Sequence, residues 1–235
     1  MATSDQIESD FKGKDILSLD QFDKQSLKKL FQATTKVKEN IPTSALSDTL
    51  TTLLFYEPSS RTFGSFSAAI KRAGGVTIDI QNPSQASSVA KGETLEDTVK
   101  TFANYSDAIV IRHPEIGSVA KAAKASDVPI INAGDGAGEH PTQALLDLFT
   151  IYEKFGTLDN LTLLMAGDIK NGRTIHSLLR GLSLFSNITV HLLSPESLNL
   201  AREDFADFEK RGLKLVEISS KSEIPKDADV WYWTR

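Results

Sequence analysis

The sequence predicts an α/β protein built from two doubly wound parallel sheets. Short, apolar, β-prone segments alternate with amphipathic helical segments along almost all of the 235 residues, and polar or glycine-rich turns separate them. Such alternation is typical of parallel sheets that helices cover on both faces. Because 40% of the residues are hydrophobic, the chain can fill two modest cores. We place the domain boundary at the start of a long helix, which gives domains 1–140 and 141–235.

Eight segments are predicted to be strands. The first reads Thr-Leu-Thr-Thr-Leu-Leu-Phe-Tyr, an apolar, β-prone run that indicates a buried strand. The predicted strands are 49–56, 76–80, 107–111, 128–132, 161–166, 188–193, 213–218 and 230–233.

Between most of these strands, apolar residues recur at the spacing of a helix. Asp23 can cap the first helix, the Gly74-Gly75 pair ends the second, and Pro141 suits the first turn of the longest. The predicted helices are 23–40, one that begins within 59–62 and ends at the glycine pair, 93–105, 116–124, 140–155, 173–185 and 198–211. We expect a polar, partly loose tail at 1–13, a mobile loop at 81–92 and a glycine-rich loop at 133–139.

Charge and composition exclude several classes of function. The net charge is −5 and the isoelectric point about 5.4, so nothing in the total indicates a nucleic acid or an acidic membrane as partner. The absence of cysteine removes disulfides, thiolate nucleophiles and cysteine-ligated metals. The N-terminus is polar and no apolar run is long enough to span a membrane. We therefore expect a cytoplasmic protein, and any anion site must be local.

The segment Ser59-Ser60-Arg61-Thr62 stands where the first predicted strand ends and a helix begins. A helix start exposes unpaired backbone N–H groups and carries partial positive charge. Three hydroxyls and a guanidinium add further donors, so the segment is suited to a tetrahedral oxyanion such as phosphate. Alternatively, the serines only cap the helix and Arg61 points into solvent.

Polar side chains follow other strands in the same way. Ligands of such sheets bind at the carboxyl ends of the strands. We therefore expect one arginine-rich active site in the cleft between the two halves. The further residues at strand ends are Arg112, His140, Gln143, Arg173 and Arg235.

In these residues the chain resembles the catalytic chains of the aspartate/ornithine carbamoyltransferase family. Five motifs stand in that family's order and cover nearly the whole chain. They are Ser59-Ser60-Arg61-Thr62, Lys91-Gly92-Glu93-Thr94, Arg112-His113-Pro114, His140-Pro141-Thr142-Gln143 and Gly172-Arg173-Thr174.

The resemblance implies a reaction in which the amine of L-aspartate attacks the carbonyl of carbamoyl phosphate. N-carbamoyl-L-aspartate and phosphate are the products, in an early step of pyrimidine synthesis. No cofactor or metal is implied. The implied catalytic residues are Arg61, Thr62, Arg112 and His140, of which the last three polarise the carbonyl oxygen.

The resemblance also assigns substrate contacts. It implies that Ser59, Ser60, Arg61 and Thr62 hold the phosphate. Gln143 accepts from the carbamoyl amide, and Arg173 and Arg235 bind the aspartate carboxylates. Ser87 and Lys91 come from a neighbouring subunit of a homotrimer whose active sites are shared between subunits. Regulatory or fused partner chains are also compatible with the resemblance.

The family continues past the position of Arg235, so we expect the 235-residue chain alone to turn over poorly. Two rival functions remain open. One is transfer to another amine such as ornithine, which Thr142 and the Lys91 loop disfavour. The other is a non-catalytic, anion-binding or assembly role.

Several motif residues also have purely structural interpretations. His140 could only cap its helix, Lys91 could be a solvated charge, and Arg173 could only neutralise Asp168. His113, His176 and His191 belong to no such constellation and are expected to pack or lie at the surface. Trp231 and Trp233 alternate with Tyr232 and are expected to pack on a sheet.

Overall fold

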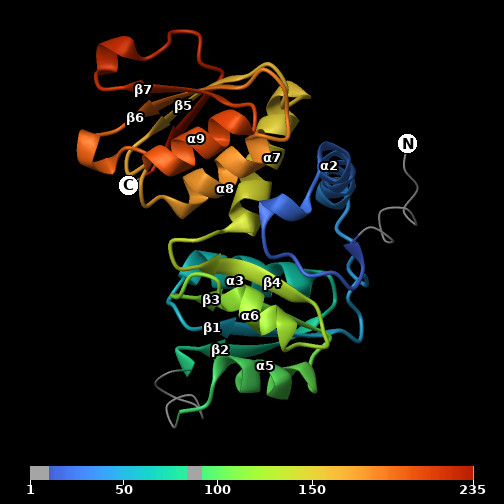
Figure 1. Cartoon of the computed structure of the whole chain (residues 1–235). Helices are drawn as coiled ribbons and strands as arrows, with labels where there is room; N and C mark the ends of the chain where they lie inside the picture. Colours follow the sequence, from blue (N-terminus) through green and yellow to red (C-terminus); the bar gives the residue numbers. More distant parts are fainter. Residues whose placement is uncertain (1–10, 84–91, 235) are drawn as a thin grey trace. The chain divides into compact units, whose positions relative to one another are not determined.

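The computed structural model describes residues 11–83 and 92–234. The chain divides into two compact units: one comprises 1–21 and 25–141, the other 22–24 and 142–235. Each contains one four-stranded parallel sheet with helices between its strands (Figure 1). The α/β class and the two parallel sheets predicted from the sequence are thereby confirmed.

The first unit has the strand order β2-β1-β3-β4. Its strands are β1 (Leu50–Phe55), β2 (Val76–Gln81), β3 (Ala108–His113) and β4 (Ile130–Asp135). Its helices are α2 (Lys24–Glu39), which follows the short helix η1 (Leu19–Gln21), α3 (Ser60–Arg72), α5 (Leu95–Ala103) and α6 (Ser118–Lys124). Ile16, which lies after the expected tail at 1–13 and in no predicted element, adds an isolated parallel bridge to Ile131.

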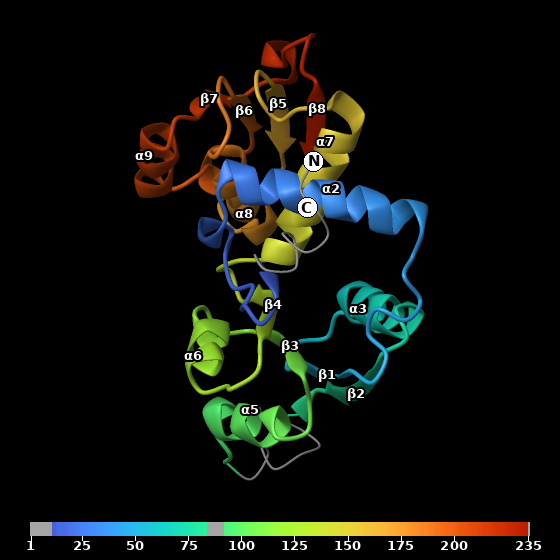
Figure 2. The same ribbon diagram turned by 90° about the vertical axis from the view of Figure 1, so that its right-hand side faces the viewer.

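Alternate residues of β1 and β3 face opposite sides of this sheet. Leu54, together with Ile109 and Ile111 of β3, packs with the buried residues of α5 and α6. Leu53, Phe55 and Val110 pack instead with Ile70 of α3. Figure 2 shows α3 on one side of the strands and α6 on the other. The sheet is therefore doubly wound. Burial of each aliphatic side chain stabilises the fold by about 1.5–3 kcal/mol.

The second unit has the strand order β7-β6-β5-β8. Its strands are β5 (Thr162–Ala166), β6 (Thr189–Leu193), β7 (Lys214–Ile218) and β8 (Val230–Trp233). Its helices are α7 (Pro141–Phe155), α8 (Arg173–Leu182) and α9 (Arg202–Lys210), with short turns η3 (Glu196–Leu198) and η4 (Lys221–Glu223). Gly181 of α8 lies so close to Leu148 of α7 that a Cβ at 181 would stand 2.4 Å from that side chain.

In each sheet, an aspartate carboxylate accepts a hydrogen bond from the first N–H group of an inner strand. The N–H of Leu50, the first residue of β1, donates to the carboxylate of Asp107 at 2.8 Å. The N–H of Thr162, the first residue of β5, donates to the carboxylate of Asp229 at 2.8 Å. Each aspartate stands just before the neighbouring strand, so it fixes the start of one strand against the next.

Most predicted elements are present, with ends that differ by a few residues. The largest differences are in α9, which begins at Arg202 instead of 198, and in β4, which begins two residues later than predicted and continues to Asp135, into the expected glycine-rich loop. Val37 of α2 is 46% exposed although its side chain is apolar. Trp231 and Trp233 were expected to pack on a sheet, but they are 53% and 60% exposed and face each other at 6.3 Å. No described helix is long and apolar enough to cross a membrane.

Candidate active site

The turn from β1 to α3 carries the Ser59–Thr62 motif. The first hydrogen bond of α3 runs from the N–H of Phe63 to the carbonyl of Ser59 at 2.9 Å. The Ser59 side chain makes no capping hydrogen bond to a described residue, so the capping interpretation of this serine was wrong. The N–H groups of the first turn therefore point out of the helix start, where an anion can take the place of a cap.

Arg112 is the second-to-last residue of β3 and lies beside the segment that leads into this motif. It pairs in register with Phe55, the last residue of β1, and the residue is 8% exposed. One guanidinium nitrogen donates to the carbonyl of Ala133 at 3.1 Å, and another forms an ion pair with Glu57 at 3.0 Å. Strand pairing and these contacts fix the guanidinium at the carboxyl edge of the sheet.

The loop after β4 positions His140, which is 6% exposed. The carboxylate of Asp135 accepts from the N–H of Glu139 at 2.7 Å and from that of Gly117 at 2.9 Å. Gly136 has a positive φ of 56°, and a Cβ there would stand 2.3 Å from the carbonyl oxygen of Pro114. Only glycine allows this close passage, so the loop delivers His140 in a fixed place.

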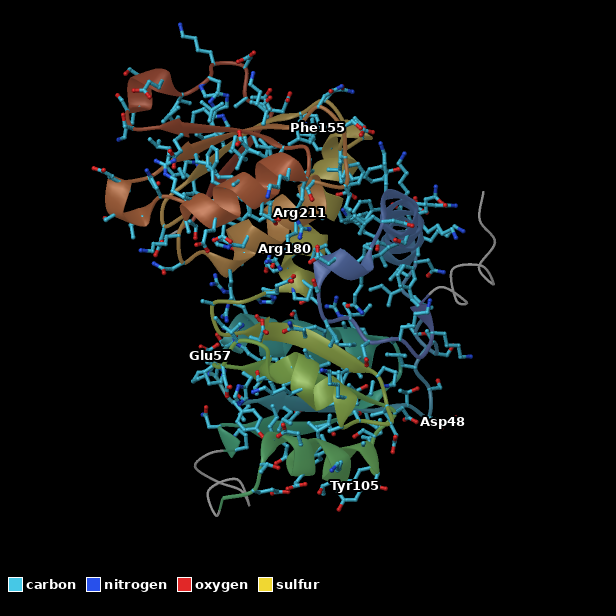
Figure 3. All side chains as sticks on the ribbon, in the orientation of Figure 1. Asp48, Glu57, Tyr105, Phe155, Arg180 and Arg211 are labelled. Atoms are coloured by element: carbon cyan, nitrogen blue, oxygen red, sulfur yellow. The ribbon has the colours of Figure 1, made fainter. Side chains whose placement is uncertain are left out.

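The three segments share one edge of the first sheet. Parallel strands end at the same side, and β1, β3 and β4 are successive neighbours. Figure 3 labels Asp48 and Glu57, which lie before and beyond β1 at opposite ends of that sheet. The predicted residues Ser59, Ser60, Arg61, Thr62, Arg112 and His140 all belong to the Glu57 end.

In the second unit, Arg173 is the first residue of α8 and is partly buried. The loop before it is held by Asp168, whose carboxylate accepts from the backbone and side-chain N–H groups of Asn171 at 3.0–3.2 Å. These bonds lower the pKa of Asp168. Gly172 lies against the carbonyl of Asp168, where a Cβ would stand 2.6 Å away. The loop is thus shaped by its own contacts around the start of α8.

Gln143 lies in the first turn of α7 and donates from its side-chain nitrogen to Asp147 at 2.9 Å. The other oxygen of Asp147 accepts from the hydroxyl of Tyr232 at 3.1 Å, and that hydroxyl also hydrogen-bonds Thr174. Tyr232 therefore links the N-terminal halves of α7 and α8, where Gln143 and Arg173 lie. Burial raises the pKa of Asp147, and burial together with the Asp147 carboxylate raises that of Tyr232 to about 12.

Three predicted site residues, Ser87, Lys91 and Arg235, lie outside the described residues. Conversely, the prediction omitted Glu57, Asp147 and Tyr232. Asp147 carried a usable signal, because a glutamine and an aspartate four residues apart are neighbours on a helix surface. Glu57 and Tyr232 gave none, since their partners lie on other elements.

The first unit also has a pocket of about 300 Å³, lined in part by Tyr56, Glu93 and His113. Its lining includes three glutamates and one lysine and none of the predicted substrate-binding residues. Negative charge of this kind repels phosphate, so the pocket is a poor candidate for the anion site. His113 packs against Tyr56 at 4.7 Å, and His176 packs against Phe208 at 6.5 Å, in agreement with the structural role expected of both.

The chain is similar in sequence to known proteins. The profile of the aspartate/ornithine carbamoyltransferase, carbamoyl-P binding domain, matches residues 14–153. Multifunctional protein pyr1-3 of Dictyostelium discoideum is 44% identical over 95% of this chain, and the chloroplastic aspartate carbamoyltransferase of Arabidopsis thaliana is 42% identical over 96%. The chain spans 10% of the first relative and 59% of the second.

A solved structure shows the same fold. Aspartate transcarbamoylase from Trypanosoma cruzi, in complex with carbamoyl phosphate and aspartate, superimposes with a TM-score of 0.89 at 38% identity. The match covers 95% of this chain and 72% of that one.

Proposed function

We propose, since this chain belongs to the aspartate/ornithine carbamoyltransferase family, that it transfers the carbamoyl group of carbamoyl phosphate to the amine of L-aspartate. The products are N-carbamoyl-L-aspartate and phosphate. The observation that carries the proposal is the gathering of the Ser59–Thr62 helix start, Arg112 and His140 at one edge of the first sheet. The first unit accordingly binds carbamoyl phosphate and the second binds aspartate.

The chemistry needs positioning and charge stabilisation more than a reactive side chain. The amine nitrogen forms a bond to the carbamoyl carbon, the carbon–oxygen bond to phosphate breaks, and the departing phosphate takes up the proton that the nitrogen loses. The substrate brings its own leaving group, so no enzyme nucleophile is required. Catalysis rests on holding two anions together and on stabilising the charge that builds on the carbonyl oxygen.

Each motif residue has a role in this scheme. The hydroxyls and first-turn N–H groups of α3 bind phosphate, with Arg61 as the neutralising cation. Arg112 is held in place by its contacts with Ala133 and Glu57, which suits it to receive the developing oxyanion. One preorganised donor of this kind lowers the barrier by about 3–4 kcal/mol. Thr62 and His140 supply the remaining donors to that oxygen.

On the acceptor side, Gln143 binds the carbamoyl amide, and Arg173 and Arg235 bind the aspartate carboxylates. Forked guanidinium groups match carboxylate geometry better than ammonium groups do. Ser87 and Lys91 belong, in this proposal, to the active site of a neighbouring subunit in a homotrimer. The Dictyostelium relative is named a multifunctional protein and this chain spans 10% of it, which supports further fused domains as one natural context. The proposed compartment is the cytoplasm.

Transfer to ornithine is the alternative within the same family. Two features of this sequence favour aspartate: Thr142 in the His140–Gln143 motif and the loop that contains Lys91. The Arabidopsis relative and the Trypanosoma structure are also named as aspartate enzymes. Product formation with each amine separates the two: turnover with ornithine and none with aspartate would reverse the assignment.

The proposal is tested most simply by calorimetric titration of the chain with carbamoyl phosphate and then with aspartate. We expect carbamoyl phosphate to bind first and aspartate to bind only afterwards. Arg61→Ala and His140→Ala each weaken the first binding step. Arg72→Ala is the matched control, since it removes an exposed cation from the far end of α3. Unchanged binding in the first two variants would support a non-catalytic role instead.

A further inference from the structure

Asp147 uses both oxygens of its carboxylate within the second unit. Oδ1 accepts from Nε2 of Gln143 at 2.9 Å, and Oδ2 accepts from the hydroxyl of Tyr232 at 3.1 Å. Gln143 and Asp147 stand one turn apart on α7, whereas Tyr232 comes from β8. The contact with β8 fixes the carboxylate, and the fixed carboxylate in turn fixes the glutamine.

A glutamine amide has two different edges. Its nitrogen donates two hydrogen bonds and its oxygen only accepts, and rotation about the last torsion exchanges them. An ionised carboxylate only accepts, so it binds the nitrogen and repels the oxygen. Asp147 therefore holds the amide with Nε2 toward itself and Oε1 directed away.

Tyr232 keeps the carboxylate of Asp147 in this orientation. Its hydroxyl donates to Asp147 and hydrogen-bonds Thr174 as well, and its pKa is raised to about 12. It therefore stays protonated at neutral pH and remains a donor toward Asp147. With Oδ2 occupied in this way, Oδ1 is the oxygen left for Gln143.

We infer that Asp147 is a positioning residue that fixes the Gln143 carbonyl oxygen as an acceptor and so selects a ligand that carries an N–H group. The inference rests on the proposed function, in which Gln143 contacts the carbamoyl group. A carbamoyl group and an acetyl group have almost the same size, but only the carbamoyl group offers N–H donors. Selection between them requires a fixed acceptor, because a freely rotating amide presents either edge.

The first test needs no ligand. The two side-chain amide protons of Gln143 are observed by ¹H–¹⁵N NMR and assigned by their loss in Gln143→Glu. We expect one of them to be shifted downfield and protected from exchange in the wild-type protein, and both features to disappear in Asp147→Asn. Asp159→Asn is the matched control, since Asp159 also accepts from two donors, Lys24 and Ser186, in the same unit.

The second test measures selection with two stable phosphonates. Phosphonoacetamide carries the amide, and 2-oxopropylphosphonate carries a methyl group in its place. We expect the wild-type protein to prefer the amide and Asp147→Asn to lose about tenfold of that preference, as expected for a lost hydrogen bond of ordinary strength. Asp159→Asn keeps the wild-type preference. Tyr232→Phe, which leaves Asp147 in place, reduces the preference by a smaller factor and serves if Asp147→Asn does not fold.

The outcomes separate this inference from the proposed function. A wild-type preference that Asp147→Asn and Tyr232→Phe both leave unchanged overturns the inference and spares the function. A wild-type protein that binds neither phosphonate contradicts the proposed function, and the inference about selection falls with it. An unshifted Gln143 amide in the wild-type protein overturns the positioning role whatever the titrations give.

Discussion

The guanidinium of Arg112 and the carboxylate of Glu57 form an ion pair of 3.0 Å at the carboxyl edge of the first sheet. Arg112 is nearly buried, whereas the Glu57 side chain is about one-third exposed. An anion that arrives at this edge therefore meets a cation that already has a carboxylate beside it. The pair keeps Arg112 in place and also competes with the ligand for it.

Removal of Glu57 should expose this competition. In Glu57→Gln the buried guanidinium loses its charged partner, so we expect the free energy of unfolding to fall by about 1–3 kcal/mol. Phosphate can replace the lost charge. The increase in melting temperature on addition of inorganic phosphate should therefore be larger in Glu57→Gln than in the wild type. An equal or smaller increase would show that phosphate does not reach Arg112.

Arg61 should matter for anion binding far more than for folding, because its side chain is exposed. We expect Arg61→Ala to raise the dissociation constant of carbamoyl phosphate about tenfold or more, since it removes a charge-assisted contact. The melting temperature without ligand should stay close to that of the wild type. Isothermal titration calorimetry beside Arg72→Ala provides the measurement, and equal affinities in the two variants would contradict the role given to Arg61.

The titration of Asp147 predicts a definite pH dependence of stability. Burial raises its pKa above the ordinary 3.8, so the folded state binds the proton more tightly than the unfolded state does. The stabilisation is complete below pH 3.8 and is lost as the pH rises through the raised value. The stability of the wild type should therefore fall relative to Asp147→Asn as the pH rises through this window. Parallel curves of melting temperature against pH would contradict the raised pKa.

His113 should have the opposite effect. Burial lowers its pKa below 6.5, although the carboxylates of Glu115, Asp135 and Glu57 act against this. Its Nδ1 accepts from the N–H of Glu115 at 3.1 Å, and a proton there would break that bond. The unfolded state thus protonates first, and stability is lost as the pH falls below 6.5 toward the lowered value.

The variant His113→Asn keeps an acceptor and removes the titration. We expect its stability to change less than that of the wild type as the pH falls below 6.5. Chemical denaturation at a series of pH values gives the comparison. His191 has a lowered pKa too and remains in both proteins, so the difference between the curves reports His113. Identical curves would assign the acid sensitivity elsewhere.

Much of the fold was predictable because its elements are defined by local patterns. The apolar run before Glu57 and the helical spacing after Thr62 each determine one element without reference to the rest of the chain. The extension of β4 to Asp135 was not predictable from such patterns. Asn-Ala-Gly-Asp is a typical loop sequence, and only pairing with β3 makes it a strand.

The candidate site divides in the same way. The phosphate-binding segment was visible because its residues are contiguous and stand at a strand–helix junction. The partner of Arg112 was not visible, since Glu57 meets it only through the register of two parallel strands. Tyr232 was noted only as the residue between Trp231 and Trp233, but strand alternation turns it toward Asp147 and leaves the two tryptophans on the other face.

A crystal structure of the chain with phosphonoacetamide tests the proposed anion site most directly. We expect the phosphonate at the first turn of α3, within hydrogen-bonding distance of the Ser60–Thr62 N–H groups and of the Arg61 guanidinium. A phosphonate bound instead in the pocket beside Tyr56 and His113, or at another edge of the sheet, would contradict it.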